Sequence, residues 1–421
     1  MKSGRTISNN AWRWATSLVA SAMLLAGAHP APVAASGDSV KADQIILRLR
    51  RASDLPAIAN QYALDAAPLD RLPVAPLYLM HIADGGRPEQ RAGDLSNDPR
   101  VLYAEPNVIG QGASDQGESS WASGESSWAS GESSWASGGP EATAAQAGLS
   151  RMRVPQALGV NRGAKVTVAV LDTGVDRTHP ALVSHLLPGQ DFVDNDADPS
   201  EVGAPGPGSA FGHGTAVAGL VAMVAPEAKI QPVRVLDQSG AGDIWRLAKA
   251  MVWAADPDGN PETADGADII NMSLSTYLRT NLTKDLLDGL SQNGHGIVIV
   301  AAAGNFGTNQ PMYPAAENGR VLSVGAVAGD DTPWIKSNYG SWVRVSAPGV
   351  GLMAPVPRAG YVRWSGTSMS AALVSGEAAL VRAAKPGMRA QAVTDWIVRT
   401  ADRLSNSAVA PRVNAAAALG L

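Results

Sequence analysis

The sequence predicts an α/β fold with a mostly parallel central sheet, preceded by a small α+β module. Apolar runs of strand length, rich in β-branched residues, recur through the second two thirds of the chain. Segments of helical length lie between these runs, which is the pattern of repeated βα units. The first third carries its own strand-like and helix-like segments. We therefore expect a three-layer α/β domain behind a smaller domain.

Composition limits the classes of protein to which the chain can belong. Its 421 residues are enough for more than one domain, and 45% hydrophobic residues argue against dominant disorder. The net charge of −5 comes without a basic block, so nucleic acid is not an expected partner. The absence of cysteine excludes disulfides, thiolate catalysis and cysteine-ligated zinc.

Residues 1–35 have the features of a secretory signal peptide. A positively charged start precedes a short apolar stretch, residues 15–28, and small residues follow, with candidate cleavage sites after Ala28 and Ala35. An uncleaved anchor is the alternative. No later stretch is apolar enough for a membrane span. We expect a secreted protein, extracellular or periplasmic, with no stable membrane span after the signal is removed.

Residues 36–109 are expected to form the small α+β module. The predicted strands are 44–49, 77–82 and 101–107, and the predicted helices are 55–64 and 91–95. After this module, the unit Gly-Glu-Ser-Ser-Trp-Ala-Ser begins at Gly117, Gly124 and Gly131. One glycine and three serines per unit oppose a helix, so 110–145 are predicted to be a flexible linker. Docking of the three tryptophans on a surface or partner is the alternative.

The third unit, residues 146–421, carries the βα pattern. Its expected strands are 166–171, 229–236, 267–274, 296–301 and 321–327, and its expected helices are 216–224, 244–254, 285–292, 369–384 and 412–419. Three polar side chains lie at element ends: Asp172, His213 and Ser368. A serine hydroxyl needs a base to take its proton, and the base needs an acid to orient it and stabilise its charge. Their joint presence indicates nucleophilic catalysis.

The segments around these residues resemble the subtilisin-like serine proteases from about Gln146 to the C-terminus. The chain order Asp, His, Ser is the subtilisin order. The resemblance implies that Asp172 orients the base, His213 is the general base and acid, and Ser368 is the nucleophile. It also implies that Asn305, in Ala-Ala-Ala-Gly-Asn-Phe-Gly, donates its amide to the oxyanion together with the Ser368 backbone N–H.

The same resemblance implies the substrate cleft and its departures from the family. The expected substrate-binding residues are Ser273, Leu274, Ser275, Ala302, Ala303, Gly304 and Met312. Ser275 stands where glycine is usual, and Met312 where relatives often have a small residue. Ala216 and Ala372 replace a second histidine and a proline of the family pattern. Tyr313-Pro314 matches a segment where relatives hold a cis peptide bond.

No required cofactor or metal is expected. Relatives with a high-affinity calcium site carry an insertion in the histidine helix, and residues 216–226 have none. Asp194, Asp196 and Asp198 could ligate calcium elsewhere, but their pattern favours an acidic surface loop. The ending Val101-Leu-Tyr-Ala-Glu-Pro-Asn107 resembles a subtilisin-type propeptide, which implies an intramolecular inhibitor and chaperone. An unrelated N-terminal domain is the alternative.

These observations predict a secreted serine endopeptidase that is made as a self-processing zymogen and acts on proteins or peptides through an acyl-enzyme. A catalytically silent relative that acts as a binding or structural protein is the main alternative. An aspartic protease would need a second carboxylate facing Asp172. An α/β-hydrolase would place its serine before its acid and its histidine.

Overall fold

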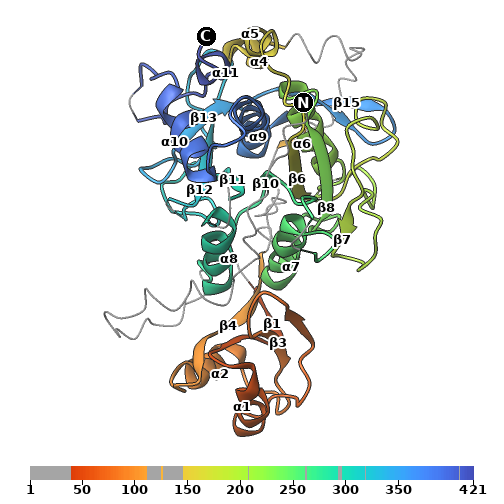
Figure 1. The fold of residues 1–421 in the computed structure, drawn as a ribbon, viewed down its shortest axis with the longest axis vertical. Helices are drawn as coiled ribbons and strands as arrows, with labels where there is room; N and C mark the ends of the chain where they lie inside the picture. Colours follow the sequence, from red (N-terminus) through yellow and green to blue (C-terminus); the bar gives the residue numbers. More distant parts are fainter. Residues whose placement is uncertain are drawn as a thin grey trace, which may run out of the picture.

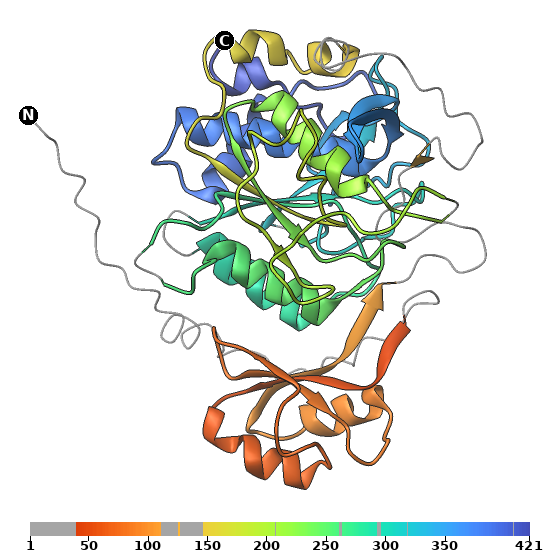
Figure 2. The same ribbon diagram turned by 90° about the vertical axis from the view of Figure 1, so that its right-hand side faces the viewer.

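The computed structural model describes residues 39–110, 125–126 and 146–421, apart from 207, 261, 262, 293–295, 318 and 407. Figures 1 and 2 show a large α/β domain with a smaller N-terminal domain packed against one side of it. The signal peptide expected at residues 1–35 lies outside the described residues. No helix within the described part of the chain is long and apolar enough to cross a membrane.

A seven-stranded sheet forms the centre of the large domain. Every neighbouring pair of strands is parallel, which confirms the predicted parallel α/β architecture. In spatial order the strands are β13 (Val345–Pro348), β12 (Val321–Val327), β11 (Val298–Ala302), β10 (Ile269–Met272), β6 (Thr167–Asp172), β8 (Lys229–Arg234) and β7 (Gln190–Asp191).

Helices cover both faces of this sheet. Strand β6 shows why, because Val168 and Val170 belong to one core and Ala169 and Leu171 to the other. The first core is closed by α6 (His213–Val224) and α9 (Thr367–Ala384), and the second by α7 (Ile244–Ala255) and α8 (Asn281–Gln292). Strands buried on both faces need continuous apolar runs, and that is the pattern the sequence contains.

The remaining elements of the large domain surround this framework. They are α4 (Ala147–Arg151), α5 (Val154–Leu158), β9 (Gly242–Asp243), the hairpin β14 (Leu352–Val356) and β15 (Gly360–Ser365), α10 (Ala390–Thr400) and α11 (Ala415–Ala418). The helix expected at 412–419 is shorter than predicted, because the Asn414 side chain accepts a hydrogen bond from Ala417 N and caps the helix there.

The N-terminal domain is the small α+β module that the sequence predicted, and its strands pair antiparallel with one another. Its sheet has the order β2-β3-β1-β4 and then continues through β9 of the large domain. Its elements are β1 (Ser39–Leu49), the short 3-10 helix η1 (Ala52–Asp54), α1 (Leu55–Gln61), β2 (Asp70–Leu72), β3 (Leu77–His81), α2 (Pro88–Ser96) and β4 (Val101–Gly110).

The two domains meet where β4 approaches α7 and α8 (Figures 1 and 2). The Glu105 carboxylate accepts hydrogen bonds from the backbone N–H groups of Asn281 and Leu282 at the start of α8 (2.8 and 2.9 Å). Asn107 Oδ1 accepts from Trp245 N in the first turn of α7 (3.2 Å). Both side chains satisfy helix N–H groups that lack a partner within their own helix. The sequence motif that ends the N-terminal domain is therefore the part that docks on the large domain.

Most of the repeat segment lies outside the described residues. Its described part, β5 (Glu125–Ser126), pairs antiparallel with Trp364 and Ser365 of β15. A purely flexible linker over 110–145 was the expectation, and this pairing is a contact that the expectation did not include. β-Strand addition to a free edge requires only backbone groups, so the composition of the repeat does not oppose it.

Candidate active site

Asp172, His213 and Ser368 each lie at the end of an element in the large domain. Asp172 is the last residue of β6, His213 is the first residue of α6, and Ser368 is the second residue of α9. Carboxyl ends of parallel strands and amino ends of the following helices meet at the same edge of an α/β sheet. All three side chains are buried.

Asp172 and His213 form the tightest contact of the site. His213 Nδ1 lies 2.7 Å from Asp172 Oδ1, which also accepts the Thr173 backbone N–H at 2.8 Å. A carboxylate that only accepts hydrogen bonds places the imidazole proton on Nδ1, so Nε2 carries the lone pair. The Trp364 ring packs edge-on against the imidazole, with 5.7 Å between centroids. The aspartate therefore sets both the tautomer and the orientation that a general base requires.

The pKa of His213 is raised above its ordinary value. Burial disfavours the imidazolium, but the charge and hydrogen bond of Asp172, together with the charge of Glu201, outweigh burial. These surroundings therefore stabilise the positive charge that His213 would acquire on taking a proton from a serine.

Ser368 lies beside Ser273, which follows β10, the strand next to β6. Its hydroxyl is 3.4 Å from the Ser273 carbonyl oxygen, and His213 Nε2 has no hydrogen-bond partner among the described residues. The serine–histidine hydrogen bond is thus not formed in this structure. Hydrogen bonds between a nucleophile and its base are often long in enzymes before substrate binds.

Asn305 is oriented by the residue before the serine. Its Oδ1 accepts from Thr367 N at 2.9 Å and from Thr367 Oγ1 at 2.8 Å. Because the amide oxygen is committed to Thr367, the amide NH₂ faces the opposite way. Asn338 supports the loop, since its Oδ1 accepts from the backbone N–H groups of Phe306 and Thr308. No sequence motif indicated Asn338, because its partners are distant along the chain.

The seven expected substrate-binding residues follow β10 and β11 or lie near them. Ser273, Leu274, Ser275, Ala302, Ala303 and Met312 are buried. Met312 lies against Gly304, because a Cβ placed on this glycine would come within 2.9 Å of the methionine sulfur. Gly304 also has a φ of +99°, which favours glycine. Tyr313–Pro314 is a cis peptide bond, and Tyr313 exchanges two backbone hydrogen bonds of 2.8 Å with Thr276.

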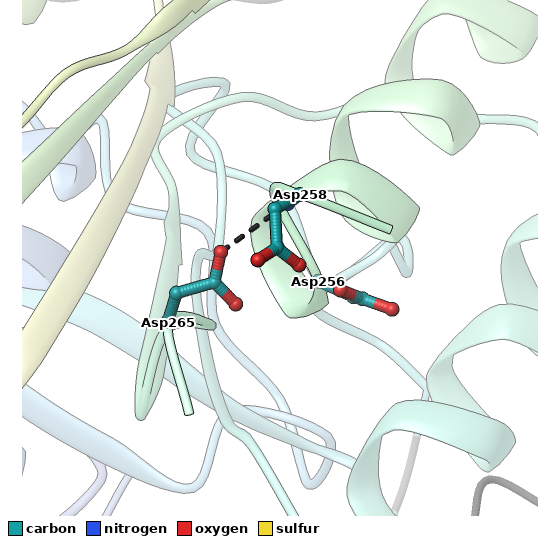
Figure 3. A group of neighbouring side chains, drawn as sticks. All are labelled: Asp256, Asp258 and Asp265. Atoms are coloured by element: carbon teal, nitrogen blue, oxygen red, sulfur yellow. Dashed lines mark hydrogen bonds between the residues drawn. The ribbon is translucent and has the colours of Figure 1, made fainter. Parts of the chain in front are cut away.

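Two sets of aspartates are the candidates for calcium binding. The three aspartates proposed from the sequence do not form a carboxylate group that could hold a metal ion in the described part of the chain. Asp194 pairs with Arg234, and Asp198 pairs with Arg177. The sequence reasoning missed a second group, Asp256, Asp258 and Asp265, after α7, whose carboxylate oxygens lie within 4.8 Å of one another (Figure 3). Asp258 N donates to Asp265 Oδ2 at 3.2 Å. Exposed acidic groups are common without an ion, so this cluster alone does not establish a metal site.

Glu201 is another residue that the sequence reasoning missed. It lies in the loop before α6, and it accepts hydrogen bonds from Thr173 and Thr215, the residues that follow Asp172 and His213 at short intervals. A single acidic residue in a loop rich in glycine and proline has no pattern that would have distinguished it.

Comparisons with known proteins identify the family of both domains. Residues 163–416 match the subtilase family, and residues 28–107 match the fervidolysin N-terminal prodomain. A thermophilic serine proteinase of Bacillus sp. (strain AK1) is 34% identical over 325 residues, covering 74% of this chain and 70% of the relative. Thermitase of Thermoactinomyces vulgaris is 34% identical over 278 residues, covering 64% of this chain and 92% of the relative.

Among solved structures, a protease of Pseudoalteromonas arctica superposes with a TM-score of 0.57 at 32% identity, covering 64% of this chain and 93% of that structure. The family match spans more than half of the chain, and the seven-stranded parallel sheet and antiparallel N-terminal domain fit it. The chain belongs to the subtilase family and is a subtilisin-like serine protease with an N-terminal prodomain.

Proposed function

We propose that the protein is a secreted endopeptidase that cleaves peptide bonds through an acyl-enzyme, with Asp172, His213 and Ser368 as its catalytic residues. The observation that carries the proposal is the 2.7 Å contact between Asp172 Oδ1 and His213 Nδ1, which leaves Nε2 as the basic nitrogen. This arrangement suits a base that must accept one proton and later return it.

In the proposed reaction, Ser368 Oγ attacks the scissile carbonyl carbon while its proton moves to His213 Nε2. Asp172 stabilises the imidazolium. The tetrahedral intermediate collapses when the C–N bond breaks and the leaving amine takes the proton from Nε2, which gives the acyl-enzyme. A water molecule then repeats the sequence, losing its proton to Nε2, and the Ser368 oxygen leaves with that proton as the acid product is released.

Negative charge on the carbonyl oxygen needs donors in both tetrahedral intermediates. We assign this role to the Asn305 NH₂ group and the Ser368 backbone N–H, near the start of α9. The orientation of the Asn305 amide by Thr367 supports the assignment. Loss of such an asparagine lowers turnover by about 10²–10³, a size known from a subtilisin.

The proposed precursor has four parts: a signal peptide at 1–35, a propeptide at 36–109, a linker at 110–145 that holds the maturation bond, and the catalytic domain at 146–421. The propeptide would act on its own catalytic domain as inhibitor and folding chaperone. Its contacts support this role, since β4 pairs with β9 through Ile109–Asp243 and Gly110–Gly242 and so directs the chain along the catalytic domain. Slow folding of large parallel sheets makes such a template useful.

Hydrolysis of internally placed peptide bonds tests the proposal. Purified wild-type protein, once processed, is expected to cleave a blocked peptide amide, and His213→Ala is expected to cleave it at least about 10³-fold more slowly. N-terminal sequencing of protein recovered from the culture medium tests export and processing. A folded, processed wild-type protein without hydrolysis would instead support a silent relative that serves as a binding protein.

Specificity for the residue before the cut bond is expected to be broad and apolar. The residues proposed for the pocket are uncharged, so an isolated Lys or Arg would lose its hydration without gaining a partner. Met312, against Gly304, should shorten the pocket yet adapt through its flexible side chain. Leu or Met should give a higher kcat/KM than Phe or Tyr, and the difference in activation free energy should be about 1–3 kcal/mol at most.

Met312→Gly should reverse this ranking in kcat/KM measured on peptides that differ only at that position. Met388→Gly is the matched control, because Met388 is half-buried in the connection after α9 and packs against a different part of the core. A wild-type preference for Lys or Arg, or an unchanged aromatic ranking in Met312→Gly, is incompatible with this account of the pocket.

We further propose that calcium is not required for stability. Helix α6 runs from His213 to Val224 without an insertion, and Arg234 supplies positive charge to Asp191 and Asp194. Chelation should then leave Tm nearly unchanged. By contrast, a calcium site that is saturated at 100 times its Kd would add about 2.7 kcal/mol to the free energy of unfolding. Calorimetry with and without EDTA makes the comparison. A drop of several degrees that disappears in Asp258→Asn would identify the aspartate cluster of Figure 3 as a calcium site.

A further inference from the structure

The Glu201 side chain joins the two backbone segments that carry Asp172 and His213. Glu201 Oε1 accepts hydrogen bonds from Thr173 Oγ1 (3.2 Å), Thr215 N (3.1 Å) and Thr215 Oγ1 (3.1 Å). Oε2 accepts from Gly212 N (3.1 Å). Thr173 directly follows Asp172, and Gly212 and Thr215 flank His213. One carboxylate thus receives donors from both sides of the aspartate–histidine pair.

The direction of these hydrogen bonds is determined by the surrounding backbone. The Thr173 hydroxyl accepts from Gly214 N at 3.0 Å, and the Thr215 hydroxyl accepts from Asp176 N at 2.9 Å. An ionised carboxylate only accepts hydrogen bonds, so each hydroxyl donates its one proton to Glu201 and accepts the backbone N–H with a lone pair. Gly212 N in turn requires an acceptor at Oε2. A carboxylate satisfies all four donors, whereas a glutamine would point its NH₂ group at an N–H or a hydroxyl that already donates.

Glu201 is itself held in place by backbone contacts. Its N–H donates to Val175 O at 3.3 Å, and Val175 N donates to Pro199 O at 2.9 Å. The loop before α6 therefore runs alongside the segment that follows β6. Negative charge at the first turn of a twelve-residue helix is also favourable for the helix dipole.

We propose that Glu201 is a positioning residue for catalysis, which clamps the end of β6 to the start of α6 and thereby holds His213 against Asp172. The inference rests on the proposed function of these two residues. Glu201 does not act on substrate, and its effect passes through the imidazole. Hydrogen bonds to charged groups are among the stronger ones in proteins, so the clamp can resist the motions that would misalign the base.

Electrostatics gives the clamp a signature that a purely structural contact would lack. The ionisable groups that act on Glu201 are Asp172, at the end of β6, and His213, at the start of α6. Burial, and to a smaller extent the charge of Asp172, raise the pKa of Glu201 to about 7 in spite of its hydrogen bonds. Its negative charge favours the imidazolium, so loss of that charge should lower the pKa of His213.

Glu201→Gln in the full-length chain tests the proposal, with a soluble peptide amide as substrate and with active-site titration to count working enzyme. We expect kcat to fall about 10-fold or more while KM stays within about twofold, since Glu201 is outside the proposed cleft. The acid limb of kcat/KM should move to lower pH, because the negative charge that favours the imidazolium is lost. The steepness of the acid limb should also fall to that of a single ionisation, because Glu201 no longer titrates together with His213.

Glu227→Gln is the matched control. Glu227 is an exposed glutamate just after α6, paired with Arg162 at 2.9 Å, and its substitution should change neither kcat nor the acid limb. If Glu201→Gln fails to accumulate as folded protein, Thr173→Val is the second variant. It removes one donor to Oε1 together with the acceptor for Gly214 N, and it should lower kcat without raising KM.

An active wild type whose Glu201→Gln variant keeps both kcat and the acid limb overturns the clamp and leaves the proposed function intact. Equal losses in Glu201→Gln and Glu227→Gln would overturn it as well, and so would an unchanged kcat in Thr173→Val. An inactive but folded wild type would instead refute the proposed function on which the clamp depends.

Discussion

Ser368→Ala is expected to accumulate as a full precursor that lacks only its signal peptide, with prodomain and catalytic domain still on one chain. The reason is that the proposed cleavage of the linker needs the Ser368 hydroxyl, while the prodomain contacts made by Glu105 and Asn107 do not involve it. Loss of the nucleophile should lower peptide hydrolysis by about 10⁶-fold, the size known from a subtilisin.

Mass spectrometry of the purified variant from a protease-free host makes the measurement. Ser370→Ala is a suitable control, because Ser370 lies two residues further along α9 and its hydroxyl donates to Ala347 O at 3.0 Å. The control should mature normally. A Ser368→Ala chain that still matures in that host would show that another enzyme cuts the linker, and the self-processing account would then be wrong.

Glu377→Gln is expected to remove a large part of the stability loss that the protein undergoes as the pH rises from about 4.5 to about 8. Glu377 lies within α9, is fully buried, and neither of its carboxylate oxygens has a hydrogen-bond partner among the described residues. Burial, followed by the charge of Asp402, raises its pKa to about 8. The folded protein therefore holds this carboxyl neutral at pH 7, where the unfolded chain would ionise it.

The sign of the pH effect follows from the raised pKa. The stabilising contribution of the neutral group is complete below the unfolded pKa, near 4.5, and it is lost as the pH rises to about 8. The free energy of unfolding falls by about 1.4 kcal/mol for each pH unit in this range, or by up to about 5 kcal/mol over the whole of it. Glutamine keeps the shape without the ionisation, so Glu377→Gln should lose less stability over this range.

Denaturant unfolding in a Ser368→Ala background, which prevents self-digestion, measures the difference between pH 5 and pH 9. Glu227→Gln again serves as control, because Glu227 is exposed and paired with Arg162. Parallel pH dependences for Glu377→Gln and its parent would contradict the buried, neutral carboxyl.

The sequence predicted the parallel sheet well because its strands are buried on both faces. Residues 321–327 are a continuous apolar run and form β12 over the same range. The hairpin β14–β15 was not predicted, because its Gly-Leu-Met-Ala-Pro-Val start and charged turn lack strict alternation. Helix α10 was also missed, although one face of it is buried. Its amphipathic pattern is readable only once the helix is separated from the preceding Lys385-Pro386-Gly387.

The residues of the candidate site also differ in how far the sequence indicated them. Asp172, His213, Ser368 and Asn305 could be proposed from the sequence, because each lies in a local motif with a stated chemistry. Glu201 was missed because its donors come from Thr173, Gly212 and Thr215, up to 28 residues away along the chain. Glu105 was seen only as part of an ending motif, and its place at the start of α8 required the two domains to be brought together. Sequence motifs therefore indicate residues whose partners are near in the chain. Contacts between distant segments, such as those of Glu201 and Glu105, become visible only in the folded structure.

Covalent labelling by a fluorophosphonate, followed by peptide mapping, tests the central claim most directly. The reagent transfers its phosphonyl group to a serine oxygen only where a base removes the proton and donors stabilise the developing charge. We expect one phosphonyl group per processed wild-type molecule, on the peptide that contains Ser368, and labelling slowed by about 10³-fold or more in His213→Ala. Labelling at a different serine, or equal labelling rates in wild type and His213→Ala, would contradict the assignment of Asp172, His213 and Ser368.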